Sequence, residues 1–436
     1  MTISYACTTC GARYESAGVI YRCPKCAGPG VGPGASEGPN ADAVPNAGAH
    51  TGFQKGNLSV EFDPAPAARK DGPVDPLLFL PLAVRGVAGF PAGGTPLVQP
   101  SRLRAAAGLP NLFLKLDNLN PSGSLKDRAS LLVAEHAALL GERSVVLAST
   151  GNAGASMACA GAAYGLEVIL FVPAAAPKAK LLQSLLYGAR VVPVNGSYDD
   201  AFALSIQYTD RYGGINRNTG YNPLTVEGKK TVSIELWNQL GGRVPDVVYV
   251  PTGDGVIFCG ACKGFADLVK AGCADRMPVM VAVQAEGSNA IARSLREGQE
   301  VTLAHASTIA DSLAVASPAS GQMALENLRR FSGRAVEVSD AEISQAQSQL
   351  CREAGAFVEP SSAAAWAGFL KDRGGIDPQS MVVVLLTGTG FKDTAAAEKL
   401  VSLPAACAPV LEDAVRLLAD SYGMRPATAA KPGPRP

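Results

Sequence analysis

The chain has no excess of charge of either sign. Its 436 residues include 38 Lys and Arg and 38 Asp and Glu, so the formal net charge is zero. Proteins that bind nucleic acids usually carry a basic surface that neutralises phosphates, so this balance disfavours nucleic acid as a partner. Long hydrophobic runs are also missing: no stretch approaches the ~18 apolar residues of a membrane span, and the N-terminus lacks a basic-then-apolar signal pattern. We therefore expect a cytoplasmic globular protein without a membrane partner.

Cysteine is too sparse for a disulfide scaffold, with ten residues in the whole chain. Four of them nevertheless lie within the first 26 residues. They form two Cys-x-x-Cys pairs separated by twelve residues, and this spacing is typical of a structural zinc site that presents four thiolates tetrahedrally. A redox-active pair and a metal-free remnant remain as alternatives. The predicted zinc ligands are Cys7, Cys10, Cys23 and Cys26.

Composition divides the chain into four segments. Residues 1–30 hold the four cysteines and predict a small zinc-ribbon-like module. Residues 31–75 are rich in Gly and Pro and have few large apolar side chains, as in a linker and arm. Residues 76–405 alternate short apolar runs with helix-length segments, which is typical of an α/β domain. Residues 406–436 predict a C-terminal helix and a disordered tail.

The predicted strands are almost continuously apolar, as strands covered on both faces are. We therefore expect open parallel sheets with helices on each side, and a site beyond the carboxyl ends of the strands. The predicted strands span 112–117, 144–149, 167–172, 189–194, 246–251, 279–284 and 381–386. The predicted helices include 127–140, 152–164, 199–211, 226–240 and 340–354.

A lysine stands at the start of one predicted helix. The segment NPSGSLKDRAS (120–130) follows a strand and places Lys126 in the first turn, where a cation opposes the helix dipole. A lysine at the mouth of an α/β cleft can lose its proton through desolvation and form a Schiff base with a carbonyl group. Taken alone, the segment also fits a charged surface turn in which Lys126 is flanked by Asp127 and Arg128.

Three further turns connect predicted strands to helices through small residues. They are ASTGNAG (148–154), PTGDG (251–255) and TGTG (387–390). Small residues let backbone amides converge at a helix N-terminus, which suits a carboxylate or a phosphate. Asp254 would repel a bound dianion, so its carboxylate must point away or pair with a cation. Each turn by itself also fits a purely structural connection.

In this order, the segments resemble the fold type II, tryptophan-synthase-like family of pyridoxal-5'-phosphate (PLP) enzymes, and within it the threonine synthases. The resemblance covers residues from about 93 to about 393, and an N-terminal four-cysteine ribbon is similar to that of many threonine synthases. It implies two open parallel-sheet lobes with PLP in the cleft between them. The motifs that carry it are GGTPL (93–97), NPSGSLKDR (120–128), ASTGNAGAS (148–156), YNPLTVEGKKT (221–231), SPAS (317–320), FVEPSSAA (357–364) and LTGTGFKD (386–393).

The resemblance also implies roles for individual residues. Lys126 would carry the cofactor and act as the acid/base of the reaction. Thr387 would face the pyridine nitrogen, and a neutral hydroxyl there favours elimination and replacement over transamination. The implied cofactor-binding residues are Lys126, Asn152, Gly253, Asp254, Gly255 and Thr387. The implied substrate-binding residues are Ser149, Thr150, Gly151, Ala153 and Thr225.

Two departures bear on the substrate. In the cofactor-phosphate loop, Asp254 and Val256 stand where the family pattern has an uncharged amide and a glycine. The other departure lies before the Glu-Gly pair. Threonine synthases carry an arginine and an Asn-Ser pair before the Glu-Gly pair, suited to the phosphate of O-phosphohomoserine. Here the matching positions hold Thr225, and Thr219 with Gly220. Losing the arginine removes a charge-assisted phosphate contact, which another cation would have to replace. The candidate replacements are Lys178, Lys180, Lys229 and Lys230.

The resemblance predicts a lyase that eliminates phosphate from O-phosphohomoserine and adds water to give threonine. A related ammonia-lyase or β-replacement enzyme, similar to a serine/threonine dehydratase or a cysteate synthase, is the first alternative. A metal-dependent binding protein with an inert catalytic lobe is the second. We expect a small amino-acid substrate and allow for a homodimer.

Overall fold

The computed structural model describes residues 2–26, 56–63, 72–84, 89–303 and 305–424. The chain forms two compact units, Met1–Asp393 and Thr394–Pro436. The first unit therefore ends before the boundary at residue 405 that we expected. Within the described residues, none of the helices combines the length and the apolar character needed to cross a membrane.

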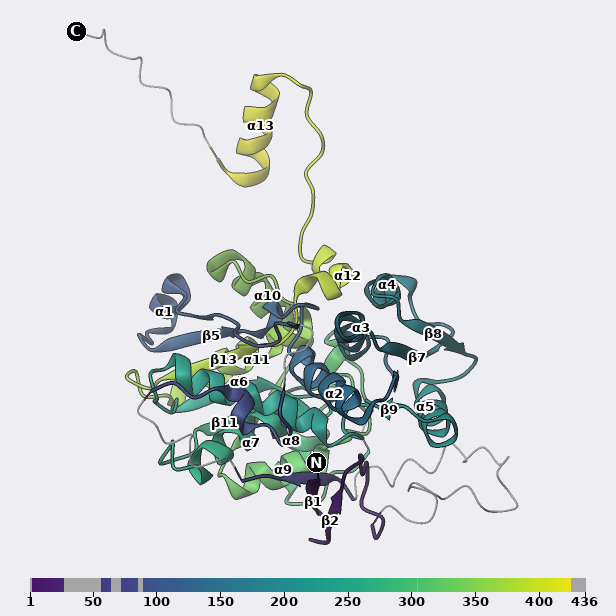
Figure 1. Cartoon of the computed structure of the whole chain (residues 1–436). Helices are drawn as coiled ribbons and strands as arrows, with labels where there is room; N and C mark the ends of the chain where they lie inside the picture. The colour runs from purple at the N-terminus through teal and green to yellow at the C-terminus, as the bar shows by residue number, and fades with distance from the viewer. Residues whose placement is uncertain (1, 27–55, 64–71, 85–88, 304, 425–436) are drawn as a thin grey trace, which may run out of the picture. The chain divides into compact units, whose positions relative to one another are not determined.

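The larger sheet of the first unit has the strand order β12-β11-β10-β13-β5-β4 (Figure 1). Its strands run parallel to their neighbours except β4, which is antiparallel to β5. Every residue of β10 and β13 is buried, which explains their continuous apolar sequences. The bounds are β4 (Leu97–Val98), β5 (Leu112–Leu116), β10 (Val247–Pro251), β11 (Val279–Ala285), β12 (Arg334–Val338) and β13 (Val382–Leu386).

Alternate residues of this sheet face two different helical layers. Val383 and Leu385 of β13 belong to the core that includes α6, α7, α8 and α9. Val382 and Val384 belong to the core that includes α1, α10 and α11. This division follows from the two-residue repeat of a strand. The bounds are α1 (Ser101–Ala107), α6 (Leu224–Gln239), α7 (Val256–Lys270), α8 (Ala290–Glu297), α9 (Gly321–Arg330), α10 (Asp340–Ala354) and α11 (Pro360–Asp372).

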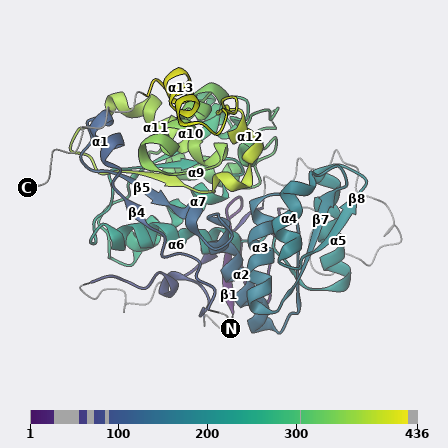
Figure 2. The same ribbon diagram turned by 90° about the horizontal axis from the view of Figure 1, so that it is seen from above.

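The smaller sheet is entirely parallel, with the strand order β8-β7-β6-β9. Figure 2 shows α2, α3 and α4 on one side of it and α5 on the other. Val145 and Leu147 of β6 pack towards α2 and α3, whereas Val146 and Ala148 pack towards α5. The bounds are β6 (Ser144–Ala148), β7 (Glu167–Pro173), β8 (Arg190–Val194), β9 (Ile215–Asn216), α2 (Lys126–Leu140), α3 (Asn152–Tyr164), α4 (Lys178–Leu186) and α5 (Tyr198–Tyr212).

The N-terminal module is a three-stranded antiparallel sheet with the order β2-β1-β3. Its strands are β1 (Ile3–Cys7), β2 (Arg13–Ser16) and β3 (Leu58–Glu61). The third strand comes from residues 31–75, which we expected to be linker and arm throughout. That expectation is corrected for β3, while residues 31–55 lie outside the described part of the chain.

The module also packs directly on the large α/β body. The rings of Tyr21 and Tyr221 stack with centroids 4.7 Å apart. The hydroxyl of Tyr21 accepts a 2.8 Å hydrogen bond from the backbone N–H of Asn216. Asn57 donates through Nδ2 to the carbonyl of Ala319 at 2.8 Å. The module is thus docked beside β9 and the turn that follows it.

Up to residue 424, the second unit contains two helices, α12 (Thr394–Glu398) and α13 (Leu411–Tyr422). Helix α13 lies within the segment for which we predicted a C-terminal helix. The predicted tail from residue 425 onwards lies outside the described residues.

Candidate active site

A pocket lies where the N-termini of α2, α3 and α7 meet the carboxyl end of β13. It holds about 410 Å³ of empty space, part of it open to solvent. Turns that leave parallel strands converge at this edge of a sheet, as expected for open α/β folds. All six residues predicted to bind the cofactor line it: Lys126, Asn152, Gly253, Asp254, Gly255 and Thr387.

Lys126 is the first residue of α2, and the backbone on both sides of it is fixed. The N–H of Leu125 donates to the carbonyl of Thr387 at 2.9 Å. The fully buried carboxylate of Asp127 accepts from the N–H of Ser122 at 2.6 Å and from its hydroxyl at 2.5 Å. These contacts tie the Lys126 turn to the end of β13 and leave its side chain facing the pocket.

A buried network of ion pairs includes Arg128, two residues after Lys126. Arg128 forms two contacts with Asp117, Nε to Oδ2 at 2.7 Å and Nη2 to Oδ1 at 2.8 Å. Its third nitrogen, Nη1, lies 2.9 Å from Glu235 Oε2, and Lys115 pairs with the other oxygen of Glu235. Such a network is costly to break, because removal of one partner leaves a buried charge without compensation.

The environment of Lys126 favours the neutral amine. Burial lowers the pKa of Lys126 from its usual range, and the nearby cation Arg217 lowers it further, whereas Asp254 and Glu359 oppose the shift. A neutral amine is the form that can attack a carbonyl or accept a proton. The direction of this shift suits the role that we predicted for Lys126, and the role itself stays a prediction.

Glu359 is a pocket residue that the sequence analysis did not single out. It precedes the first residue of α11, and its Oε1 accepts a 2.8 Å hydrogen bond from Asn152 Nδ2. Burial raises the pKa of Glu359 to about 7, with Lys126 and Lys392 acting in the opposite direction. A Cβ atom at Gly388 would lie 2.1 Å from Glu359 Oε1, so a larger residue there would displace the Glu359 carboxylate. The signal was a lone acidic residue within the motif FVEPSSAA.

The turn after β6 is held by a serine side chain. Ser149 Oγ accepts from the N–H groups of Gly151 at 3.2 Å and Gly154 at 3.0 Å. Thr150 and Gly151 line a neighbouring cavity with about 590 Å³ of empty space, which shares Asn152 and other residues with the first pocket. Ser149 and Ala153 are not among the lining residues of either space. Ser149 holds the turn through these hydrogen bonds, and Thr150 and Gly151 line the neighbouring cavity.

The turn after β10 is tightly enclosed. Gly255 has φ +86°, and a Cβ atom there would lie 2.8 Å from the carbonyl oxygen of Ser320. A Cβ atom at Gly253 would lie 2.8 Å from the carbonyl oxygen of Ser312. Asp254 accepts a 2.9 Å hydrogen bond from the N–H of Val256 through Oδ1. The loop therefore packs closely against the backbone of Ser312 and Ser320, and its carboxylate lies at the N-terminus of α7.

Thr225 is buried in the first turn of α6 and does not line either pocket. Its hydroxyl donates to the carbonyl of Asn222 at 2.7 Å and accepts from the N–H of Gly220 at 3.4 Å. The hydroxyl is thus used within its own turn. This geometry gives no support to direct contact between Thr225 and a substrate.

The four candidate replacement lysines differ sharply in their surroundings. Lys178 is exposed, and Lys180 pairs with Asp311 at 3.0 Å. Lys230 lies 2.7 Å from each of two buried carboxylates, Glu227 and Asp267. Lys229, by contrast, is fully buried, and its Nζ has no hydrogen-bond partner in the described part of the chain.

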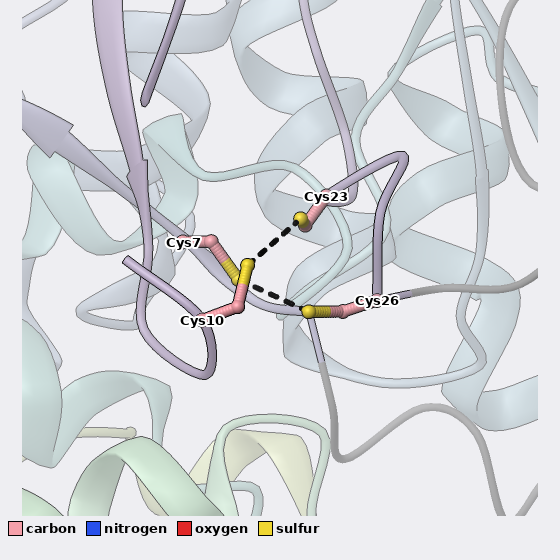
Figure 3. A group of neighbouring side chains, drawn as sticks. All are labelled: Cys7, Cys10, Cys23 and Cys26. Carbon is pink, nitrogen blue, oxygen red and sulfur yellow. Dashed lines mark hydrogen bonds between the residues drawn. The ribbon is translucent and has the colours of Figure 1, made fainter. Parts of the chain in front are cut away.

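The four N-terminal cysteines lie together at one end of the β1–β2 module (Figure 3). Cys7 Sγ is 3.8 Å from Cys26 Sγ, Cys10 Sγ is 3.8 Å from Cys23 Sγ, and all four sulfurs lie within 4.8 Å of one another. A tetrahedron with zinc–sulfur bonds of about 2.3 Å has edges of about 3.8 Å. The geometry therefore fits a four-coordinate metal ion.

Comparison with known proteins gives the family. A family model described as "Pyridoxal-phosphate dependent enzyme" matches residues 90–388, which include the whole pocket. The chain belongs to this family. Within the family, it is homologous to threonine synthases, which are PLP-dependent lyases. The threonine synthase of Methanosarcina acetivorans is 32% identical over 396 residues, covering 89% of this chain and 91% of that protein. The threonine synthase of Methanocaldococcus jannaschii is 36% identical over 310 residues, covering 70% and 76%.

Solved structures of the family share the fold. The T.th. threonine deaminase is 25% identical with a TM-score of 0.60, and the match covers 68% of this chain and 92% of that one. Maize serine racemase, at 21% identity and a TM-score of 0.62, covers 76% and 97% and supports the fold alone. These matches confirm the predicted fold type II architecture.

The residues present fit the cofactor of the family. A lysine that burial disposes to the neutral state, two glycines that admit no Cβ and a helix N-terminus surround one enclosed space. A helix N-terminus next to glycines is suited to a phosphate group. The pocket thus has the parts that a phosphorylated pyridine aldehyde needs.

Proposed function

We propose that this enzyme converts O-phosphohomoserine and water into threonine and inorganic phosphate. In this reaction phosphate leaves Cγ with the bonding electrons, and Cγ gains a proton. Cβ loses a proton and gains the hydroxyl group of water. The remaining proton of water goes to the phosphate. The observation that carries the proposal is the placement of Lys126 in the pocket of a chain homologous to threonine synthases.

In this proposal Lys126 holds the cofactor and moves the protons at Cα and Cβ. Burial lowers its pKa, and this direction favours the neutral amine, which is the form that accepts a proton. PLP, when bound, supplies the electron sink that stabilises negative charge at Cα. Glu359 lies near Lys126 and can buffer its proton, because its own pKa is close to neutrality.

The other pocket residues would bind and orient. Thr387 would face the pyridine nitrogen, Asn152 would contact the ring, and the Gly253–Gly255 turn would hold the cofactor phosphate. The backbone N–H of Thr150 would hold the substrate carboxylate, because Thr150 lines the adjoining cavity together with Gly151, whose own N–H donates to Ser149 Oγ. Ser149 would act through the shape of that turn, and we assign no direct contact to Ala153 or Thr225.

The test is a comparison of products. The purified enzyme is given O-phosphohomoserine, O-phosphoserine, threonine and serine, and released phosphate, threonine and keto acid are measured. We expect phosphate and threonine in equal amounts from O-phosphohomoserine, and no turnover by Lys126→Ala. Keto acid from threonine or serine, with O-phosphohomoserine left intact, would refute the proposal.

An amino-acid ammonia-lyase is the second candidate. Two observations favour it: Thr225 offers no charge to a substrate phosphate, and a threonine deaminase is among the structures that match at 25% identity. The same product assay separates the two activities, because only the ammonia-lyase would yield keto acid.

We also propose that Cys7, Cys10, Cys23 and Cys26 hold one structural zinc ion. The sulfur–sulfur distances support this, as do two Cys-x-x-Cys turns with no further ligand nearby among the described residues. Metal analysis should find about one zinc per chain, and a disulfide in zinc-free protein would refute the assignment. A cytoplasmic location and a homodimeric state complete the proposal.

A further inference from the structure

Two buried basic side chains have nitrogen atoms without a hydrogen-bond partner among the described residues. Arg217 follows β9, Lys229 lies in the second turn of α6, and both side chains are fully buried. Arg217 Nε and Nη2 and Lys229 Nζ form neither a hydrogen bond nor an ion pair within the residues that the structure describes. Buried nitrogen donors normally have an acceptor, so these unpaired atoms are suited to bind an anion.

The two cations belong to one electrostatic cluster with the pocket. Burial lowers the pKa of Lys229 well below its usual value, and the charges of Lys126 and Arg217 lower it further. Burial lowers the pKa of Arg217 to about 10, against the attraction of Asp254 and Asp127. Asp254 stabilises the charge on all three cations.

Packing places Lys229 against the helix whose N-terminus faces the pocket. A Cβ atom built at Gly260, in the second turn of α7, would lie 2.7 Å from Lys229 Cβ. The lysine therefore crosses α7 close to its N-terminus, where backbone N–H groups and the helix dipole favour an anion. The charge of Lys229 is also felt by Cys259 in the first turn of α7 and lowers the pKa of that thiol, against the larger effect of burial.

Arg217 comes from the segment that also contains Thr225. Its Nη1 donates to Thr219 Oγ1 at 2.6 Å, and the adjacent Gly220 N–H bonds to Thr225 Oγ1 at 3.4 Å. One nitrogen anchors the guanidinium, and the other two remain free to form a bidentate contact. An arginine is thus present in this segment, eight positions before the threonine that stands where an arginine was expected.

We propose that Arg217 and Lys229 are binding residues for a phosphate monoester dianion at the α7 end of the pocket. The inference rests on the proposed function for the substrate as one source of that phosphate, and the cofactor is the other. Lys229 lies beside the α7 N-terminus, whereas Arg217 lies beside the Thr219–Thr225 segment. The nearby Lys230 cannot serve, because Glu227 and Asp267 already neutralise it.

The experiment separates the two sources with the full-length chain. The wild-type protein, Lys229→Met, Arg217→Met and Arg217→Lys are first stripped of cofactor and titrated with PLP and with pyridoxal, which lacks the phosphate. The reconstituted holoenzymes are then titrated with inorganic phosphate by calorimetry. Lys178→Met, which removes an exposed lysine of α4, is the matched control.

Loss of one charged phosphate contact should weaken binding by roughly 10- to 100-fold. If the cofactor is the source, Lys229→Met or Arg217→Met weakens PLP binding by this factor and leaves pyridoxal binding unchanged. If the substrate is the source, PLP binding is retained and inorganic phosphate binds the holoenzyme more weakly. Arg217→Lys should keep part of the affinity in either case, and thermal unfolding confirms that each variant is folded.

Unchanged affinity for both PLP and inorganic phosphate in the two folded methionine variants would overturn the inference. Equal losses for PLP and pyridoxal would also overturn it, because they would show a structural effect that does not involve phosphate. Neither titration uses turnover. A chain that proves inactive on O-phosphohomoserine therefore still gives an answer on the phosphate site.

Discussion

Glu359→Gln should remove a specific dependence of stability on pH. Burial raises the pKa of Glu359 from 4.5 to about 7 in the folded protein, and only 5% of the residue's surface is exposed. Below pH 4.5 both the folded and the unfolded chain carry the proton. Between pH 4.5 and 7 only the folded chain retains it, so the free energy of unfolding falls by about 1.4 kcal/mol per pH unit. Above pH 7 the loss from this group levels off at about 3 kcal/mol.

Glutamine removes this titration and keeps the carbonyl that accepts from Asn152 Nδ2. Urea unfolding of the cofactor-free wild-type and variant proteins at about pH 5 and about pH 8 measures the effect. The variant should gain about 2 to 3 kcal/mol relative to wild type between these two values. Glu167→Gln removes a half-exposed carboxylate of β7 and should show no comparable change. Parallel pH dependence of wild type and Glu359→Gln would show that Glu359 is already charged at the lower pH.

Three further changes test the framework of the site. Asp117→Asn leaves the buried Arg128 without its bidentate carboxylate. The free energy of unfolding, measured in urea, should fall by about 3 to 5 kcal/mol. A loss below about 1 kcal/mol would contradict the network. Gly255→Ala forces a side chain into a positive φ and towards the Ser320 carbonyl, so it should cost at least about 1 kcal/mol and weaken PLP binding measured by absorbance. Unchanged PLP affinity would count against the turn as the cofactor loop. Tyr21→Phe leaves the buried N–H of Asn216 unpaired and should lower the free energy of unfolding by about 1 to 3 kcal/mol. Hydrogen exchange at the Asn216 amide should become faster. Unaltered exchange would refute the docking contact.

The sequence predicted the buried core of the fold well. All seven predicted strands are present with ends within one residue, because strands such as β10 and β13 are apolar along their whole length. β12 was missed because it is a half-exposed edge strand whose sequence, RAVEV, mixes charged and apolar residues. β3 was missed because its partner, β1, lies some fifty residues earlier, and no local pattern encodes that pairing.

The site residues also differ in how far the sequence predicted them. Lys126 and the glycine turns were visible because their roles depend on contiguous motifs at the ends of strands. Glu359 and Arg217 were not singled out, and Lys229 was only one of four candidate phosphate contacts, because each becomes informative only through its burial and its neighbours. Lys229 and Lys230 show the limit of sequence reasoning well, since adjacent lysines on one helix differ completely in their ion pairing.

The docking of the N-terminal module has a consequence for the order of folding during synthesis. Tyr21 contacts Asn216 and Tyr221, and Asn57 contacts Ala319, so the surface that receives the module is encoded some 200 to 260 residues later. The module therefore leaves the ribosome long before the surface on which it packs. Contacts of such sequence separation close slowly, and until they form the apolar face of β1 stays uncovered. A metal ion bound early by the four cysteines would hold the nascent module folded during that interval.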